Sequence, residues 1–396
     1  MNDDNIVIVS AKRTPIGTFQ GALSTVPAPE LGARAIAAAL DSASVGGEEV
    51  SEVIMGCVLP AGVGQAPARQ AALAAGVPNS VGCTTVNKVC GSGMKAVTLA
   101  SDLIRAGSAE IVVAGGMESM SLAPYLLPNA RSGMRMGHQQ VIDHMFYDGL
   151  QNPYDGEMMG YYAEATVDKY RMTRMEQDDF ARQSVLRARE ASESGAFKDE
   201  IIPVLVKSRR SETLVETDEE PYRCDLEKIP TMRPAFRPEG GTVTAASSSS
   251  ISDGAAALVL MSESVANERR LLPLATIAGH AGHAQAPEWF TTAPQHSIAA
   301  LLDKLNWAPG SIDLYEINEA FAVVTLGAMR DLGLSIDRVN VNGGACALGH
   351  PIGATGARMI VTLAYAMNQR HAGRGIASLC IGGGEGLALG LIHKDG

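Results

Sequence analysis

The two ends of the chain repeat one order of strand-like and helical segments, and this repetition constrains the fold more than any other feature. Ala114-Gly-Gly-Met-Glu118 resembles Ile381-Gly-Gly-Gly-Glu385, and each closes a short apolar segment of the kind found in buried strands. A helical segment opens at Gly93 before the first of these turns, and another opens at Gly356 before the second. Similar segments in the same order at both ends indicate a diverged internal duplication.

Strand and helix signals alternate within both ends, which is typical of an α/β protein whose helices flank a sheet. Between about residues 120 and 250 this alternation gives way to proline, methionine and charged stretches. One helix remains clear there, because Thr173 and Glu176 form a capping box and Gly195 ends the pattern. The expected strands are 5–10, 52–58, 110–114, 253–260, 312–318, 338–341 and 377–381, and the expected helices begin near residues 30, 66, 93 and 356.

These patterns predict three regions. An N-terminal domain covers residues 1–119 and is completed by 251–272, because strand character returns at 253–260. Residues 120–250 form an inserted cap or loop domain, since so long a segment that keeps helical periodicity is more typical of a functional insertion than of a linker. Residues 273–396 form the C-terminal domain.

Composition and charge limit the partners. The chain has 46% apolar and 19% charged residues, which fits a compact protein. Its net charge of −11 opposes general attraction to nucleic acid or to anionic membranes, so we expect neither as a partner. Basic residues between 207 and 239 alternate with acidic ones and indicate a solvated mixed surface.

The cysteines and the N-terminus indicate a reducing compartment. The six cysteines contain no C-x-x-C pair and no Cys/His metal spacing, so we expect neither a disulfide framework nor a metal site. The N-terminus runs almost at once into the strand-like segment 5–10, without the pattern of a signal peptide. No apolar run approaches the roughly 18 residues of a membrane span. We therefore expect a cytoplasmic protein.

One cysteine stands at a turn between a strand-like and a helical segment, in the stretch NKVCGSGMK at 87–95. A cysteine attacks as its thiolate, and a helix N-terminus or a neighbouring imidazole can lower the thiol pKa from its usual value of about 8.5. Taken alone, the stretch fits a buried structural cysteine better, because free cysteine is among the most buried residue types.

Three further turns carry candidate reactive groups. The segment 340–358, NVNGGACALGHPIGATGAR, surrounds His350 with glycines, which implies a close approach of the backbone to another group. Cys380 lies at the end of a strand, and Asn318 follows another strand. Singly, these residues fit a satisfied buried histidine, a core cysteine and a helix cap. Together with Cys90, they lie at corresponding ends of duplicated sheets, which favours convergence on one site.

Taken together, these motifs resemble those of the thiolase family, specifically its acetyl-CoA acetyltransferase group. The resemblance runs from SAKRTPIG at 10–17 through NKVCGSG, GGMES at 115–119, NEAFA at 318–322 and NVNGGACALGHPIGATGAR to CIGGGEG at 380–386. It implies the α/β thiolase fold, with two duplicated sheet domains in five α-β-α-β-α layers and an inserted loop domain. It also implies a homodimer or a homotetramer.

The resemblance further implies a role for each matching residue. Cys90 is expected to be the nucleophile that becomes acylated, His350 to activate it, and Cys380 to move the α-proton of a second acyl-CoA. Asn318 and His350 are expected to form one oxyanion site through a bound water, and the backbone N–H groups of Cys90 and Gly382 the other. The implied substrate-binding residues are Leu150, Met158, Met159, Ala245, Ser249, Phe290, Ala320 and Phe321.

The expected reaction condenses two acetyl-CoA into acetoacetyl-CoA and CoA, or runs the reverse cleavage, in the metabolism of fatty acids. Sulfur suits it because thiolates attack and leave readily, and a second cysteine can act as acid or base. No metal or redox cofactor is required, since coenzyme A thioesters are the substrates. The alternatives are a degradative 3-ketoacyl-CoA thiolase of broader chain length, a Cys-His acyl-CoA hydrolase that leaves Cys380 idle, and a silent acyl-CoA-binding protein.

Three positions depart from the pattern of short-chain members. Residues 246–250 read ASSSS where many members have Gly-Asn-Ala-Ser-Gly, although Ser249 matches the serine that contacts the pantetheine arm. Met158 stands where a histidine is usual, and Phe290 aligns with a common methionine of the acyl pocket. These departures are expected to change acyl preference and CoA affinity while the chemical step keeps its residues.

Overall fold

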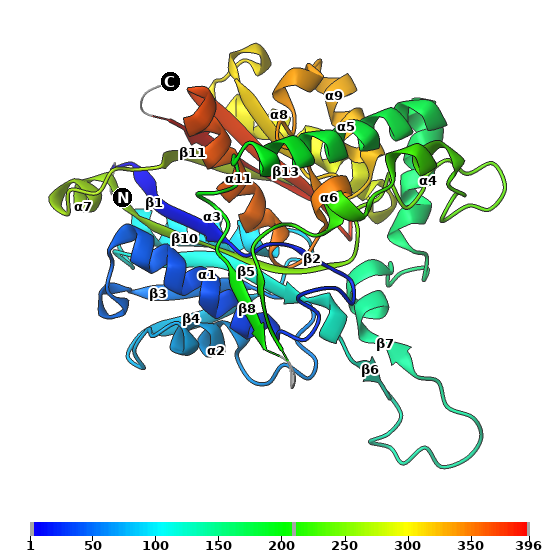
Figure 1. The fold of residues 1–396 in the computed structure, drawn as a ribbon, viewed down its shortest axis with the longest axis horizontal. Helices are drawn as coiled ribbons and strands as arrows, with labels where there is room; N and C mark the ends of the chain where they lie inside the picture. Colours follow the sequence, from blue (N-terminus) through cyan, green and yellow to red (C-terminus); the bar gives the residue numbers. More distant parts are fainter. Residues whose placement is uncertain (1–3, 208–210, 394–396) are drawn as a thin grey trace.

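A ten-stranded sheet runs through the computed structural model, which describes residues 4–207 and 211–393 (Figure 1). The strands of its first half are β1 (Ile6–Arg13), β2 (Gly17–Thr18), β3 (Glu52–Gly56), β4 (Gly82–Val86), β5 (Val112–Ser119) and β10 (Ser252–Ser262). Those of its second half are β11 (Ala275–Ala284), β12 (Leu314–Ile317), β13 (Arg374–Ile381) and β14 (Glu385–Ile392). Apart from β2, which pairs with β10, the strand order is β12-β13-β14-β11-β1-β10-β5-β3-β4.

The two halves of the sheet have matching topology, which supports the predicted duplication. In the first half β4, β3 and β5 are parallel, and β10 and β1 follow antiparallel. In the second half β12 and β13 are parallel, and β14 and β11 follow antiparallel. The halves join where β1 pairs with β11, from Ile6 opposite Ile277 to Ile8 opposite Ala275. Strand β10 lies inside the first half of the sheet although it follows the long insertion.

One expected strand does not form. Residues 338–341 contribute only a parallel bridge between Val339 and Tyr315, at the place where β4 pairs with β3 in the other half. Asn340 has a left-handed φ of 48°, and its side chain exchanges hydrogen bonds with the backbone N–H and C=O of Ile317 at 2.8 Å. Because αL backbone does not continue a strand, pairing stops after one residue.

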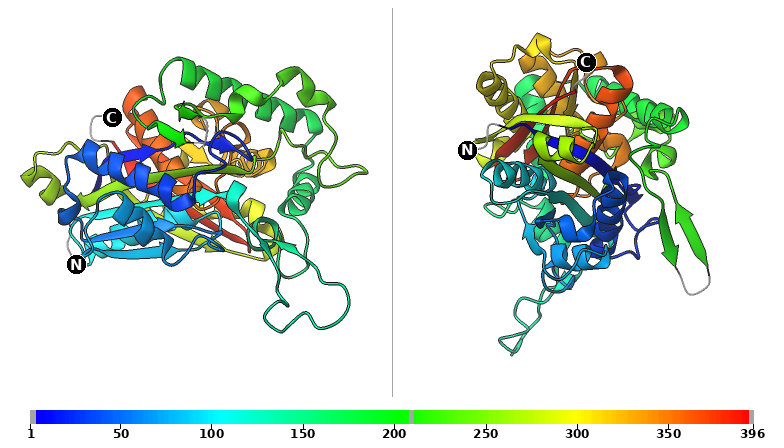
Figure 2. Two further views of the ribbon diagram at one scale, coloured as in Figure 1. Left: turned by 60° about the horizontal axis from the view of Figure 1, so that its bottom comes forward. Right: turned by 90° about the vertical axis from the view of Figure 1, so that its left-hand side faces the viewer.

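The helices complete five layers (Figure 2). Helices α3 (Ser92–Arg105) and α11 (Thr355–Arg370) pack against each other between the two halves of the sheet. Helices α1 (Ala28–Ala43) and α2 (Pro67–Ala74) cover the outer face of the first half. Helices α8 (Ala293–Leu305) and α9 (Ala322–Leu332) cover that of the second half. This arrangement is the layered architecture that the family resemblance implied.

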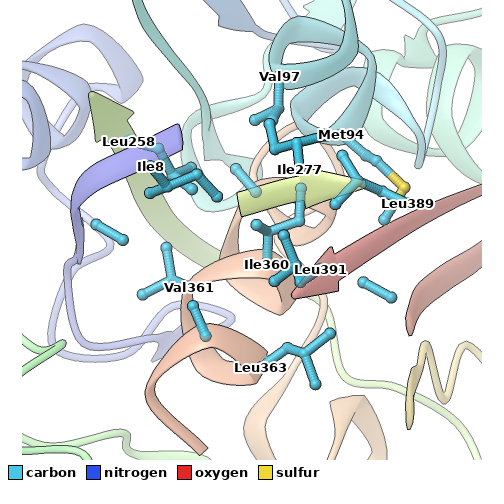
Figure 3. Close-up of a cluster of buried hydrophobic side chains, with 14 of the residues drawn as sticks. Ile8, Met94, Val97, Leu258, Ile277, Ile360, Val361, Leu363, Leu389 and Leu391 are labelled. Carbon is cyan, nitrogen blue, oxygen red and sulfur yellow. The ribbon is translucent and has the colours of Figure 1, made fainter. Parts of the chain in front are cut away.

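The middle layer is the largest apolar core, and it joins residues from both halves (Figure 3). Ile8 and Leu258 of the first half and Leu389 and Leu391 of the second are all fully buried there. Gly93 and Gly356 allow α3 and α11 to approach: a Cβ at Gly93 would lie 2.8 Å from the backbone N of Ala357. A Cβ at Gly356 would lie 2.5 Å from the backbone N of Met94. Each of the two glycines that marked the duplication therefore packs against the backbone of the other helix.

The chain between β5 and β10 covers one end of the sheet and includes a loop between β6 and β7 that projects from the body in Figures 1 and 2. The predicted capping box of Thr173 and Glu176 starts α5. Buried Arg13 ties this region to the first half through ion pairs with Glu200 at 2.6 Å and Asp218 at 2.7 Å. The elements are η2 (Met120–Leu122), β6 (Tyr125–Leu126), β7 (Ile142–Asp143), η3 (Phe146–Leu150), α4 (Met159–Tyr170), α5 (Arg174–Glu193), β8 (Val204–Lys207), β9 (Glu212–Val215), α6 (Glu220–Arg223) and η4 (Leu226–Thr231).

Shorter elements complete the fold and are η1 (Gly47–Glu49), α7 (Glu263–Glu268), η5 (Pro287–Thr292), η6 (Pro309–Ser311), η7 (Ile336–Arg338) and α10 (Ala345–Leu348). Within residues 4–207 and 211–393, no helix has the length and apolar character needed to cross a bilayer. The same residues contain no cluster of His, Cys, Asp and Glu side chains arranged to hold a metal ion.

Candidate active site

A cavity of about 240 Å³ opens where loops from both halves of the fold meet. Cys90 lies between β4 and α3, His350 lies between α10 and α11, and Gly382 follows β13. All three line the cavity. Because α3 and α11 are duplicated neighbours in the middle layer, the turns that precede them lie side by side. The structure therefore brings together residues separated by almost 300 positions.

The turn that carries Cys90 is tightly held. The backbone N–H of Lys88 donates to Oγ of Ser92 at 2.9 Å, and this hydroxyl donates to the carbonyl of Val89 at 2.7 Å. Val89 has a φ of 47°, which is strained for a β-branched residue. Strain of this kind persists where surrounding contacts over-determine the backbone. It is a feature typical of functional turns.

Burial of the Cys90 thiol outweighs the effect of the helix N-terminus, which by itself can lower a thiol pKa. Burial raises the pKa of Cys90 to about 11, although the backbone N–H groups of Gly382 and of Cys90 itself act in the opposite direction. Desolvation disfavours the thiolate more than these dipoles favour it. The thiol is therefore protonated at neutral pH and requires a base.

His350 has the protonation state of such a base. Its Nδ1 lies 2.6 Å from Oγ1 of Thr355, and that hydroxyl donates its hydrogen to the carbonyl of Pro351 at 3.0 Å. The hydroxyl must then accept from Nδ1–H, which leaves a lone pair on Nε2. Burial, with a smaller contribution from Arg358, lowers the pKa of His350 to about 3. Nε2 has no hydrogen-bond partner among the described residues, so His350 is not the fully satisfied core histidine of the alternative interpretation.

Asn318 and Cys380 are buried in the same region but are not among the residues that line the cavity. Asn318 follows β12, and its backbone N–H donates to Ser378 at 2.9 Å. Its side-chain Oδ1 and Nδ2 have no partner in the described chain, and Phe321, not Asn318, caps α9. An unpaired buried amide is costly unless a water or ligand satisfies it.

Cys380 is fully buried near the end of β13, packed in a cluster that includes Met159, Phe290 and Phe321. Burial, reinforced by the nearby Cys90, raises the pKa of this thiol well above its usual range. Cys380 therefore has the surroundings of a core cysteine, which was the alternative interpretation of its sequence position. Those surroundings also make its thiolate a strong base.

Most of the implied substrate-binding residues line the cavity. Ser249 does so with its hydroxyl donating to the carbonyl of Ala320 at 3.1 Å. Ala245 differs: it is exposed and is not among the lining residues. The other implied residues that line the cavity are Leu150, Met158, Met159, Phe290, Ala320 and Phe321.

Several functional positions escaped the sequence reasoning. The cavity wall includes Phe236, whose ring meets Phe321 edge to face at 5.8 Å between centroids. Gly160 allows this packing, because a Cβ there would lie 2.3 Å from the Phe236 ring. No motif marks Phe236. The further lining residues are Met120, Phe146, Gly149, Ser248, Ser250, Ile251 and Ile352.

Two buried carboxylates hold the loops of the site. Glu118 accepts hydrogen bonds from the backbone N–H groups of Val58 at 2.9 Å and Gly353 at 2.9 Å, and burial raises its pKa to about 7. Glu319 accepts from Asn340 at 2.8 Å and from the backbone N–H of Cys346 at 3.0 Å. Both residues lie inside quoted motifs, GGMES and NEAFA. An acidic residue at the end of an apolar strand was the signal that could have identified them.

Comparison with known families identifies the family to which this fold and site belong. Residues 6–264 match the model of the thiolase N-terminal domain, and residues 271–393 match that of the thiolase C-terminal domain. The chain belongs to the thiolase family. The motifs around Cys90, His350 and Cys380 are thus the motifs of a thiolase, as the sequence resemblance indicated.

This thiolase is similar to proteins named acetyl-CoA acetyltransferase. It is 49% identical over 392 residues to the one from Cupriavidus necator, covering 98% of this chain and 100% of that protein. It is 50% identical to acetyl-CoA acetyltransferase 2 of Arabidopsis thaliana, covering 99% of this chain and 98% of the relative.

Among solved structures, the acetyl-CoA acetyltransferase of Bacillus anthracis superposes with a TM-score of 0.96 at 43% identity, covering 98% of each chain. The Acat5 thiolase of Ascaris suum, in complex with coenzyme A, superposes with a TM-score of 0.93 at 41% identity. That match covers 98% of this chain and 99% of the Ascaris chain.

Proposed function

We propose that this thiolase is an acetyl-CoA C-acetyltransferase, which converts two acetyl-CoA into acetoacetyl-CoA and CoA and catalyses the reverse cleavage. The observation that carries the proposal is one cavity lined by the Cys90 thiol and by the neutral imidazole of His350, with a second thiol, Cys380, buried nearby. The full-length similarity to proteins of this name supports it.

In the first half-reaction, Nε2 of His350 takes the proton of the Cys90 thiol, and the thiolate attacks the carbonyl carbon of acetyl-CoA. The tetrahedral intermediate collapses to S-acetyl-Cys90 and a CoA thiolate, which takes the proton back from the imidazolium. The backbone N–H groups of Cys90 and Gly382, directed at the sulfur of Cys90, would also donate to an oxyanion formed beside it. These dipoles are fixed before the reaction, so they stabilise the charge as it develops.

In the second half-reaction, the thiolate form of Cys380, which its raised pKa makes scarce but strongly basic, removes a methyl proton from a second acetyl-CoA, and the carbanion attacks the acetyl carbon on Cys90. Acetoacetyl-CoA forms, and the proton passes from Cys380 to the departing Cys90 thiolate, so the Cys90 thiol and the Cys380 thiolate are restored. The unpaired Nδ2 of Asn318 would hold a water that donates to the enolate oxygen, and Nε2 of His350 would join this site only while it carries a proton. Unsatisfied buried polar atoms are consistent with this use.

A steady-state assay tests the proposal. We expect thiolysis of acetoacetyl-CoA that requires free CoA, together with slower turnover of 3-ketoacyl-CoA of longer chain. Turnover that free CoA does not accelerate would indicate a hydrolase instead. Equal rates from C4 to C16 would indicate the thiolase of broad chain length.

Phe290 is expected to limit acyl chain length. It is 2% exposed and lines the cavity, so its ring blocks a straight extension of the acyl chain. Phe290→Ala should lower the preference for C4 over C8 substrates, measured as the ratio of kcat/KM values, and should cost about 3 kcal/mol of stability or more. Phe197→Ala is the matched control, because Phe197 is 3% exposed and lies outside this cavity. An unchanged ratio in Phe290→Ala, or the same change in both variants, would contradict this role.

We also propose that the chain has three domains, at 1–119 plus 251–272, at 120–250 and at 273–396. We propose that the protein is cytoplasmic. We propose in addition that it forms a homodimer or a homotetramer. Apolar side chains on and beside the projecting loop between β6 and β7 support association: Tyr125, Leu127, Met136 and Val141 are 68%, 49%, 91% and 57% exposed. Exposed apolar patches of this kind typically mark interfaces. Light scattering in solution measures the mass, and a monomer at micromolar concentration would contradict the assembly.

A further inference from the structure

Behind the part of the cavity wall formed by Phe290, one face of α4 contacts the turn η5 at three points. The ring of Tyr162 meets Phe290 edge to face, with centroids 6.4 Å apart and planes at 85°. Oγ1 of Thr166 lies 2.5 Å from Oγ1 of Thr291, and Nζ of Lys169 lies 4.5 Å from the ring centroid of Trp289. Residues spaced by four and three positions share one face of a helix, so these three contacts follow from the register of α4.

The hydroxyl of Tyr162 is fixed in turn by the loop that precedes α4. Nδ2 of Asn152 donates to it at 2.6 Å, and the hydroxyl donates to Oδ2 of Asp155. The loop is closed by the hydrogen bond from the backbone N–H of Asn152 to the carbonyl of Glu157 at 2.8 Å. Tyr162 is 3% exposed and does not line the cavity, so it touches the cavity wall only through other side chains.

We propose that Tyr162, anchored by Asn152 and Asp155, is a positioning residue that holds the Phe290 ring in place and thereby sets the limit on acyl chain length. This inference rests on the proposed function, because it concerns the acyl group handled by the same cavity. An aromatic ring held edge-on by a second ring is stabilised beyond the effect of its burial. Loss of the hydroxyl anchor frees the Tyr162 ring to shift, and the Phe290 wall yields to a longer chain.

The arrangement also connects Phe290 to a second segment of the cavity lining. Leu150 and Met158 lie on either side of the anchoring loop and line the cavity, and Gln151 and Met158 form an isolated antiparallel bridge. A single hydroxyl thus ties this segment and the Phe290 wall to one helix. Deletion of the hydroxyl is therefore expected to alter acyl selectivity more than the chemical step, since Tyr162, unlike Cys90 and His350, does not line the cavity.

The test compares Tyr162→Phe with Tyr161→Phe. Both remove one hydroxyl from adjacent residues of α4, but Tyr161 is 45% exposed and does not line the cavity. For each variant and the native enzyme, kcat and KM are measured for 3-ketoacyl-CoA of C4, C6 and C8. Tyr162→Phe should raise the ratio of kcat/KM for C8 over C4 by about three- to tenfold, mainly through a lower KM for C8. Tyr161→Phe should leave the ratio within a factor of two of the native value.

Asp155→Ala provides an independent measurement should Tyr162→Phe fail to fold. Asp155 is exposed, and its removal takes away the acceptor of the Tyr162 hydroxyl, so the ratio should move in the same direction. If folded Tyr162→Phe keeps the native C8-to-C4 ratio of kcat/KM, the positioning role is wrong. If Tyr162→Phe does not fold, a native ratio in Asp155→Ala leads to the same conclusion. A rise in the ratio in Tyr161→Phe equal to that in Tyr162→Phe would also overturn the role. Failure of the native enzyme to cleave acetoacetyl-CoA with CoA would instead reject the proposed function.

Discussion

Cys90→Ala should reduce both condensation and thiolysis by roughly 10⁵-fold or more, the scale seen when an enzyme loses its nucleophile. The reason is that no other described thiol lines the cavity, and Cys380 is fully buried. Incubation of the native protein with acetyl-CoA, followed by intact and peptide mass measurement, should place one acetyl group on the peptide that contains Cys90. The alanine variant should carry none.

Cys83→Ala is the matched control for this result. Cys83 lies on β4, is partly buried and does not line the cavity, so the same deletion there should leave turnover near the native value. Near-native thiolysis by Cys90→Ala would show that the nucleophile has been assigned to the wrong residue. An acetyl group on Cys380 in that variant would identify the alternative.

Cys380→Ser should separate the two half-reactions. A hydroxyl is a far poorer acid or base at neutral pH than a thiol, so condensation should fall by about two to four orders of magnitude. Exchange of labelled CoA into acetyl-CoA needs only Cys90 and His350 and should persist. Comparing the two rates on one preparation of the variant gives the result directly.

The control for this second variant is Cys224→Ser, since Cys224 is half-buried directly after α6 and does not line the cavity. It should lower neither rate appreciably. If Cys380→Ser slows exchange and condensation equally, Cys380 acts in acylation or supports the cavity, and the proton-transfer role is wrong.

The reactive groups could be found from the sequence because short-range signals mark them. The glycines about His350 and the turn at Cys90 lie within a few residues of the group they serve, and the duplication relates the two ends of the chain. The family resemblance added the roles of Cys90, His350, Cys380 and Asn318. The two variants above test the roles of Cys90 and Cys380, and the roles of His350 and Asn318 remain predictions.

Other features required the folded chain. Phe236 reaches the cavity from a segment without a motif, and Ala245 lies near Ser249 in sequence yet is exposed and outside the lining. The strand expected at 338–341 reduced to one bridge because Asn340 turns its side chain to Ile317. A side-chain hydrogen bond to a distant backbone is invisible to local periodicity.

The sequence alone determined the α/β duplication, the family and the identity of the candidate reactive residues, because each depends on residue types at short spacing. The tertiary structure decided their electrostatics. A position at a helix N-terminus can lower a thiol pKa, whereas burial raises the pKa of Cys90 to about 11 and lowers that of His350 to about 3. Desolvation depends on atoms brought together from the whole chain, and here it outweighs the local dipole. The tertiary structure also brings the Tyr162 ring against Phe290, which lies 128 positions later in the sequence, because α4 packs on η5.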